Sequence, residues 1–351
     1  MSSAFLLYGA TGFVGQEIAR LAVEGGLEPV LAGRDSVRIE RLASELGVDC
    51  RVFDLSESQK IEEAFKNMTV VLNCAGPYIH TYKPMVEACL RTGTHYLDLT
   101  GEIPVYEALA TLDEEARARG VMLLPGVGFD VVPTDCLAVH LKGRLPLATR
   151  LIIASGFEGR AGFPPGSQRT MNEWLHYGIR VRRNGRLEFP RQPTKTRMVD
   201  FGQGPVQATL FPWGDVFTAY YSTGIPNIEN YNVISERARK QLSRVYSLRP
   251  FLKFSIVRNM LKREIKPGPT AEKRARSISH VWGQVQDDQG RSAISRLHGP
   301  EGGVVWTARA ALAGVRKVLS GDAPLGYQTP GKAYGPDFVL ECEGVTREDL
   351  D

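Results

Sequence analysis

Three glycines near the start of the chain could hold a phosphate group. Gly9, Gly12 and Gly15 lie three residues apart, between a short apolar run and a helical pattern. Gly9 would let the chain leave a strand sharply, Gly12 would let the backbone approach a pyrophosphate, and Gly15 would let the helix pack closely on a sheet. The free N–H groups and the positive dipole end of that helix would face the anion. The predicted cofactor-binding turn is therefore Gly9, Ala10, Thr11, Gly12, Phe13, Val14 and Gly15.

The surroundings of these glycines favour a dinucleotide as the ligand. Their spacing, G-x-x-G-x-x-G, differs from the G-x-G-x-x-G fingerprint, and a glycine-rich turn without a ligand is the plain alternative. A predicted strand precedes them, a helix over Gln16–Glu24 follows, and a second strand over Pro29–Ala32 completes a βαβ unit. In NAD-binding proteins an acidic residue at the end of this second strand usually binds the ribose 2′-OH. This chain has Arg34 there, and a guanidinium pairs well with a 2′-phosphate, so we expect NADP, with Asp35 as a competing ribose acceptor.

Length and composition describe an ordinary globular chain. The 351 residues suggest two domains, and 43% hydrophobic with 23% charged residues are typical of a soluble protein. The net charge of +4 is too small to indicate a nucleic-acid partner. The five cysteines lack C-x-x-C spacing and the six histidines lack metal-ligand spacing, so we predict neither disulfides nor a metal site. We expect a cytoplasmic protein, because the thiols suit a reducing compartment, the first strand begins too early for a signal peptide, and no apolar run approaches ~20 residues.

Strands and helices alternate through the first third of the chain. The expected strands are Phe5–Tyr8, Pro29–Ala32, Cys50–Phe53, Val70–Cys74, His95–Leu97 and Val121–Leu124, and the expected helices are Gln16–Glu24, Ser36–Leu46, Glu57–Lys66, Lys83–Thr92 and Val105–Arg119. This rhythm predicts an α/β fold of the Rossmann type, a doubly wound parallel sheet with helices on both faces. Ligands bind beyond the carboxyl ends of such strands, so the informative residues lie where strands end. Those positions are Gly9, Arg34, Asp54, Cys74–Tyr78, Asp98–Glu102 and Gly126–Asp130.

From about residue 147 the pattern changes to an α+β insert. The expected strands are Leu151–Ala154, Met198–Phe201, Val206–Phe211, Val216–Ser222, Ile278–Val285 and Ser292–Leu297, and the expected helices are Gln168–Ile179 and Glu236–Arg263. A mostly antiparallel sheet with helices on one face would supply a wall over the nicotinamide. A last helix, Val305–Leu319, follows near the C-terminus.

Several segments together carry a family resemblance. They are Gly9–Gly15, Ala32–Arg34, Asn73–Tyr78, Tyr96–Glu102, Gly128–Asp135 and the tail Gly326–Gly335. The set resembles the saccharopine dehydrogenase-like oxidoreductases, most closely their trans-acting enoyl reductase branch. The resemblance implies a Rossmann domain over residues 1–146, completed by residues 300–351, with residues 147–299 as an inserted substrate and dimerisation domain. It implies NADPH as the cofactor and carries cofactor contacts over to Gly12, Arg34, Gly76 and Pro77; Asp54 and Ala75 join the predicted cofactor set because they lie at strand ends.

Three side chains at the strand ends are candidates for a proton donor. Hydride delivery to C=C, C=N or C=O leaves negative charge on the substrate, which needs an acid placed nearby. Tyr78 follows the fourth strand, while Asp98 and Glu102 surround the end of the fifth. Each has a structural alternative: packing beside the cofactor for Tyr78, and loop hydrogen bonding or helix capping for the two carboxylates. Asp130 is expected to cap a helix beginning at Val131 rather than to take part in catalysis.

The stretch Glu236–Arg263 is unusually basic. It holds nine basic residues and one acidic residue, interleaved with large apolar side chains. The simple interpretation is a solvated basic helix over a core. The alternative is a surface for an acidic carrier protein or an anionic membrane, which would suit an enzyme with a tethered acyl substrate. We predict no nucleic-acid contact, since no recognisable module accompanies the charge.

Three functions remain open from the sequence. The first is NADPH-dependent reduction of an enoyl bond in a lipid or polyketide acyl intermediate, by a protein that the resemblance suggests is a homodimer. The second is reduction at an amino-acid C=N bond, which would need arginines to hold carboxylates; the candidates are Arg160, Arg169, Arg180, Arg182 and Arg183. The third is an NADPH-binding regulator without turnover. A short-chain dehydrogenase is disfavoured, because no tyrosine is followed four residues later by lysine.

Overall fold

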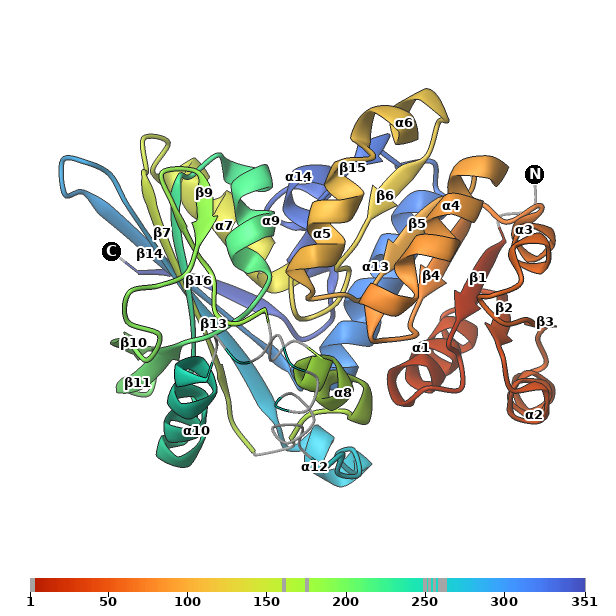
Figure 1. Cartoon of the computed structure of the whole chain (residues 1–351), viewed down its shortest axis with the longest axis horizontal. Coiled ribbons are helices and arrows are strands. Elements are labelled where there is room, and N and C mark those ends of the chain that lie inside the picture. The colour runs from red at the N-terminus through yellow and green to blue at the C-terminus, as the bar shows by residue number, and fades with distance from the viewer. Residues whose placement is uncertain are drawn as a thin grey trace.

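Two β-sheets organise the molecule (Figure 1). The computed structural model describes residues 4–159, 162–173, 177–248, 251, 254, 257 and 264–350. One sheet is built mainly from the N-terminal third and the other mainly from the middle of the chain. Helix α13 (Thr307–Leu319), near the C-terminus, returns to pack against α1 (Phe13–Glu24) at the beginning of the chain.

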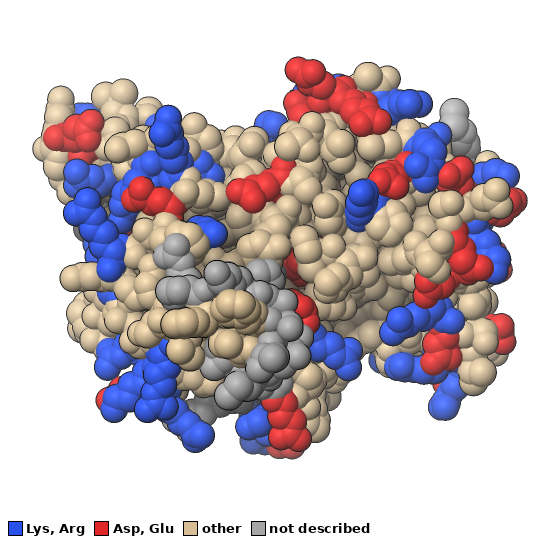
Figure 2. Space-filling view, viewed as in Figure 1, with Lys and Arg blue, Asp and Glu red and all other residues tan. Residues whose placement is uncertain are grey.

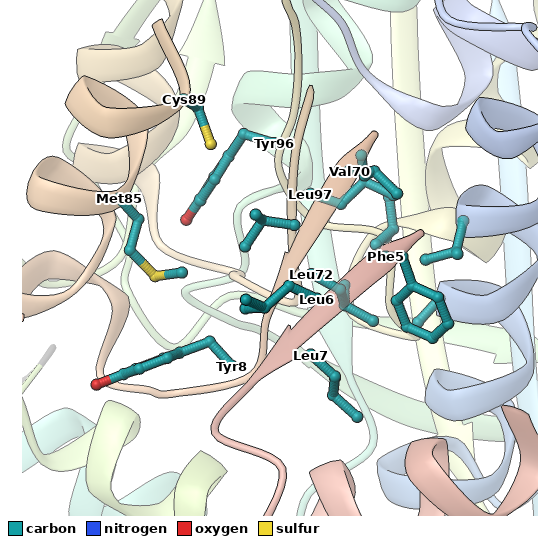
Figure 3. Packing of buried hydrophobic residues seen from close by; sticks show 14 of the residues in the cluster. Phe5, Leu6, Leu7, Tyr8, Val70, Leu72, Met85, Cys89, Tyr96 and Leu97 are labelled. Atoms are coloured by element: carbon teal, nitrogen blue, oxygen red, sulfur yellow. The ribbon is translucent and has the colours of Figure 1, made fainter. Parts of the chain in front are cut away.

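The first sheet has seven described strands, all parallel, in the order β15-β6-β5-β4-β1-β2-β3. Their bounds are β1 (Phe5–Tyr8), β2 (Pro29–Gly33), β3 (Cys50–Val52), β4 (Val70–Asn73), β5 (His95–Asp98), β6 (Met122–Leu124) and β15 (Gly326–Tyr327). The central strands are buried along their whole length, which is why they read as unbroken apolar runs. Figure 3 shows Leu6 and Leu7 of β1 in one core with Leu72 of β4 and Leu97 of β5. The parallel order confirms the predicted Rossmann-type fold.

Helices flank this sheet. They are α1 (Phe13–Glu24), α2 (Ser36–Leu46), α3 (Ser58–Phe65), α4 (Tyr82–Thr92), α5 (Ile103–Ala110), α6 (Asp113–Ala118) and α13 (Thr307–Leu319), with a 3₁₀ turn at Tyr78–His80. Helix α1 begins three residues earlier than predicted, directly after Gly12. The predicted helix Val105–Arg119 is two helices, because the chain breaks at Thr111 and Leu112 between α5 and α6.

The second sheet has nine described strands and is mostly antiparallel. They are β7 (Arg150–Phe157), β8 (Val181–Arg183), β9 (Arg186–Glu188), β10 (Thr196–Asp200), β11 (Pro205–Leu210), β12 (Asn227–Asn232), β13 (Ile278–Gln286), β14 (Ser292–Pro300) and β16 (Thr346–Leu350). The main order is β10-β11-β12-β7-β13-β14-β16, in which β7 and β12 run parallel. Helices α7 (Val132–Arg144) and α9 (Asp215–Thr223) pack on one face through a core that includes Leu137, Leu151 and Val281.

Shorter helices complete the second half and the C-terminal segment. They are α8 (Pro165–Glu173), α10 (Glu236–Ser247), α12 (Ala271–Ala275), α14 (Pro330–Tyr334), a π-helical turn at Gly302–Trp306 and a 3₁₀ helix at Phe338–Glu341. The predicted helix Gln168–Ile179 begins earlier, and its described part ends at Glu173. Of the predicted helix Glu236–Arg263, α10 is described, and most of the remainder lies outside the described residues. Within the described ranges, no helix is long and apolar enough to cross a bilayer.

Two expectations for the second half are wrong. Val216–Ser222 forms helix α9 and not a strand, because Val216 and Ala219 pack together into the core beside α7, which is helical and not strand spacing. The C-terminal segment does not return wholly to the first sheet: β15 joins β6, but β16 pairs with β14 of the second sheet. Helix α7 likewise lies before residue 147 yet packs on β13 and β14. The two halves are therefore interleaved along the chain.

Candidate active site

A cavity of about 1020 Å³ lies where the parallel strands of the first sheet end. The turns after β1, β2 and β4 line one side of it, and the loop Gly128–Asp130 after β6 also contributes. The second half lines the rest with Phe157 and Glu158 at the end of β7, residues of α8, and Ile278 and Ser279 of β13. Both halves of the molecule therefore contribute to one site.

The turn after β1 can be made only with glycine at two of its positions. Gly9 has a φ of +80°, a left-handed conformation that other residues adopt only with strain. A Cβ placed on Gly15 would lie 2.3 Å from the carbonyl oxygen of Gly9, so any side chain there would push α1 away from the turn. The N-cap of α1 is Gly12, and no side chain caps this helix end. The first N–H groups of α1 are thus left for a ligand in the cavity.

Two arginines line the cavity at the end of β2. Arg34 was predicted, whereas sequence analysis missed Arg38, which follows one helical turn later. The Arg38 guanidinium donates to the carbonyl oxygen of Thr11, at 2.8 Å between Nη2 and the oxygen, which ties it to the glycine turn. The Asp35 carboxylate caps α2 by accepting from the backbone N–H of Arg38 at 3.1 Å. Asp35 therefore has a structural use, but it also lines the cavity, so the alternative that it binds a ribose hydroxyl stays open.

The other predicted cofactor residues are also gathered here. Those that line the cavity are Gly9, Thr11, Gly12, Phe13, Val14, Arg34, Asp54, Ala75, Gly76 and Pro77. Ala10 and Gly15 lie behind the turn, buried in the core. Asp54 is held by Ser56, whose backbone N–H and hydroxyl both donate to its carboxylate, and these bonds lower its pKa.

Of the three predicted proton donors, only Tyr78 lines the cavity. Burial raises the pKa of Tyr78 well above its usual range, so its hydroxyl stays neutral. Glu102 is buried behind it and accepts from the backbone N–H groups of Tyr78 and Ile79 at 2.7 and 2.8 Å. Asp98 is also buried and accepts from Thr100 N–H, Gly126 N–H and the Tyr96 hydroxyl, each at 2.9 Å. The two carboxylates hold the walls of the cavity in place, and neither is among its lining residues.

Asp130 is the carboxyl that sequence analysis assigned wrongly. Helix α7 has Val131 as its N-cap and no side-chain capping bond, so Asp130 does not cap it. Its side chain is partly exposed and lines the cavity, and no hydrogen bond joins its carboxyl to another described residue. Burial raises the pKa of Asp130 to about 7. A carboxyl in these surroundings is protonated much of the time at neutral pH, so it can give a proton to a bound molecule.

Aromatic side chains form a wall of the cavity where the two halves meet. The ring centroids of Trp306 and Phe129 are 5.2 Å apart, those of Phe129 and Phe157 5.6 Å, and those of Phe157 and Phe163 6.2 Å. Phe129, Phe157 and Phe163 line the cavity, as do Met171 and Trp213. Phe129 immediately precedes Asp130, so the apolar wall and the acid meet.

Comparison with known proteins agrees with this geometry. Residues 5–124 match the family model described as the saccharopine dehydrogenase NADP-binding domain. This part of the chain therefore resembles the NADP-binding domain of that family. The resemblance inferred from the sequence is confirmed, and NADP(H) is the cofactor of the domain. The glycine turn, the uncapped end of α1 and the cationic pair Arg34 and Arg38 suit its pyrophosphate and 2′-phosphate, so the residues fit the group.

Individual relatives match this chain in sequence over less than half of its length, and one solved structure matches its fold over the whole length. The chain is 31% identical over 179 residues to a saccharopine dehydrogenase-like oxidoreductase of Bos taurus, covering 44% of this chain and 42% of that protein. It is 38% identical over 148 residues to a trans-acting enoyl reductase of Mycobacterium leprae, covering 40% of this chain and 35% of that protein. The chain thus matches less than half the length of these relatives. The apo histidine-tagged saccharopine dehydrogenase (L-Glu forming) from Saccharomyces cerevisiae shares the fold over 100% of both chains, with a TM-score of 0.68 and 13% identity.

Proposed function

We propose that this protein is an NADPH-dependent oxidoreductase that reduces the enoyl bond of a lipid or polyketide acyl intermediate. The observation that carries the proposal is the Asp130 carboxyl, which lines the cavity, has a pKa of about 7 and lies beside an aromatic wall. The NADP-binding domain supports a redox reaction, and a relative's name, trans-acting enoyl reductase, supports the type of bond.

The proposed chemistry needs one hydride and one proton. NADPH supplies the hydride when bound. Hydride addition to the β-carbon of an enoyl thioester breaks the C=C π-bond and leaves negative charge delocalised onto the thioester oxygen; protonation at the α-carbon completes the saturated product. Asp130 gives that proton and becomes a carboxylate, which water recharges after product leaves. Tyr78, with its pKa far above neutral, is a hydrogen-bond donor at the same cavity and not the acid.

The aromatic wall supports an apolar acyl body for the substrate. Phe129, Phe157 and Phe163 offer aromatic surface beside the acid, where an acyl chain would exclude water from the reacting carbon. Reduction of an amino-acid C=N bond would instead need several cations for the carboxylates.

The described arginines give that second chemistry little support. Arg169 lines the cavity, but Arg180 lies over the ring of Phe189, 3.4 Å from its centroid. Arg182 is buried over Tyr220, and Arg183 pairs with Glu229. The fifth candidate, Arg160, lies outside the described residues.

Exchange of Asp130 for asparagine tests the proposal. We expect Asp130→Asn to lower kcat with an enoyl thioester by about 100-fold or more, while the Kd for NADPH stays unchanged. In the wild type, kcat should fall as pH rises through about 7, because the acid loses its proton, and the variant should lack this dependence. Asp322→Asn, at an exposed position, is the matched control.

A substrate panel separates the alternatives. NADPH oxidation with enoyl thioesters alone supports the proposal, and turnover of imines formed from amino acids would replace it with the C=N chemistry. Tight NADPH binding without hydride loss to any enoyl, imine or carbonyl compound would indicate a regulator. We further propose a cytoplasmic homodimer acting on a small or carrier-tethered acyl substrate; five free thiols support the reducing compartment.

A further inference from the structure

Helix α10 presents a row of cations to solvent. Leu242 packs against a core of the second sheet and Val245 is buried, which anchors the helix. Arg237, Lys240 and Arg244 lie on the other face, three and four residues apart, and all three are exposed. The helix as a whole carries four basic residues and one acidic residue. Figure 2 shows Lys and Arg side chains gathered at the lower left of this view, where Figure 1 places α10.

Most of this charge is not neutralised within the described part of the chain. Lys240 pairs with Glu236 at 2.7 Å, but both side chains are more than 60% exposed, so the pair is open to water. Arg237 and Arg244 form no ion pair with a described residue. A row of cations left in solvent is available to an anionic partner.

Large apolar side chains follow the cations directly. Leu248 is 38% exposed and Phe251 is 53% exposed. Apolar side chains this exposed are unfavourable in water, and an apolar surface rimmed by charge marks a contact site. We call Arg237, Lys240, Arg244, Leu248 and Phe251 the α10 surface.

The described chain beyond α10 contacts α8, a helix that lines the cavity. Figure 1 shows α10, α8 and α12 along one edge of the molecule. The chain that leaves α10 reaches Lys266, whose backbone N–H donates to the Gln168 side chain of α8 at 2.9 Å, while Gln168 donates back to the Lys266 carbonyl at 3.1 Å. Several residues of α8, among them Arg169 and Thr170, line the cavity.

We propose that the α10 surface binds the face of an anionic lipid bilayer. The cations would meet lipid phosphates, while Leu248 and Phe251 would enter the boundary between headgroups and acyl chains. An acidic protein would satisfy the arginines equally well, but the exposed apolar side chains favour the bilayer, which alone offers a continuous apolar layer beneath the charge. This inference does not depend on the proposed reduction, because membrane binding is measured without NADPH or substrate.

Vesicle sedimentation tests the proposal. The full chain should bind vesicles of phosphatidylcholine with phosphatidylglycerol at least about tenfold more tightly than vesicles of phosphatidylcholine alone, and added salt should weaken the binding. Each cation near such a surface contributes roughly fivefold, so the combined variant Arg237→Glu, Lys240→Glu, Arg244→Glu should lose about 100-fold or more. The variant Leu248→Ser, Phe251→Ser should bind anionic vesicles about tenfold less tightly while keeping the salt dependence.

A matched control separates local from global charge. Arg41, Lys60 and Lys66 are exposed on the first half, and their combined change to Glu alters the net charge by the same amount. Retained vesicle binding in this control supports the α10 surface. Equal binding to both vesicle types, or an equal loss in the control, would overturn the proposal. A third outcome would also overturn it: the wild type does not bind vesicles, and the combined glutamate variant of α10 loses binding to an acidic acyl carrier protein. The partner would then be that protein.

Discussion

The two sides of the cavity differ in what lines them: mainly backbone groups on one side and large side chains on the other. On the first-sheet side, backbone geometry forms the surface: the turn from Gly9 to Gly12 and the segment at Tyr78, which Glu102 holds through two backbone N–H groups. On the other side, large side chains form it, with Phe157 and Phe163 in an aromatic row. A backbone surface suits an invariant ligand such as a dinucleotide, while a side-chain surface can be altered residue by residue for different substrates.

The backbone side should tolerate almost no added atoms. We expect Gly15→Ala to weaken NADPH binding by more than about 100-fold and to destabilise the fold by several kcal/mol, roughly 3 or more. The new Cβ would lie 2.3 Å from the Gly9 carbonyl oxygen, so α1 must move away from the turn that it supports. Fluorescence titration with NADPH and chemical denaturation measure the two effects.

A second glycine provides the control for this prediction. Gly143 lies in α7, and a Cβ there would meet nothing within 4 Å. Gly143→Ala should leave NADPH binding unchanged and stabilise the protein by up to about 1 kcal/mol. Similar losses in both variants would show that the tight turn is not what sets cofactor affinity.

The contrast also explains what could be predicted from the sequence. The cofactor side depends on local signals, namely strands buried on both faces that read as apolar runs and glycines at fixed offsets from them. The other side depends on long-range packing. Helix α9 has the β-branched and aromatic residues that are typical of a strand, and it is the packing of α9 against α7 that favours the helix. The direction of the side chains at the strand ends could not be predicted from the sequence either. Asp98 and Glu102 are buried in the protein, whereas Asp130 lines the cavity.

Substitution of the buried Glu102 should therefore affect stability, whereas substitution of Asp130 should affect catalysis. Glu102→Ala would leave the N–H groups of Tyr78 and Ile79 without their acceptor, so we expect a loss of about 2 to 3 kcal/mol in the free energy of unfolding. Glu107→Ala, at an exposed position on α5, should change it by less than about 0.5 kcal/mol. A Glu102 variant of normal stability but greatly reduced kcat would return this residue to the catalytic candidates.

Asp130 should lower the stability of the fold when it is ionised, so its effect should depend on pH. Its pKa in the folded protein is about 7, above the ordinary value of 3.8, so between these values the folded state keeps a proton that the unfolded state has released. The free energy of unfolding should fall as pH rises through this window, by about 2 kcal/mol because the carboxyl is partly exposed. Asp130→Asn removes this fall, so the variant should be more stable than the wild type at about pH 8 and similar to it near pH 4. Parallel stability curves for the two proteins would contradict the assignment.

The smallest expected effect concerns the two arginine side chains on the cofactor side of the cavity. Arg34 and Arg38 line the cavity at the end of β2, where their guanidinium groups suit a 2′-phosphate. We expect the wild type to bind NADPH at least ~10-fold more tightly than NADH, a difference of about 1.4 kcal/mol. Arg34→Ala should remove most of this preference by weakening NADPH binding and not NADH binding, and Arg38→Ala should remove part of it. Arg41→Ala, on the exposed face of α2, should keep the preference intact. If the preference for NADPH survived in both the Arg34 and the Arg38 variant, other residues would recognise the 2′-phosphate. Backbone groups alone would then form the cofactor side of the cavity at the end of β2.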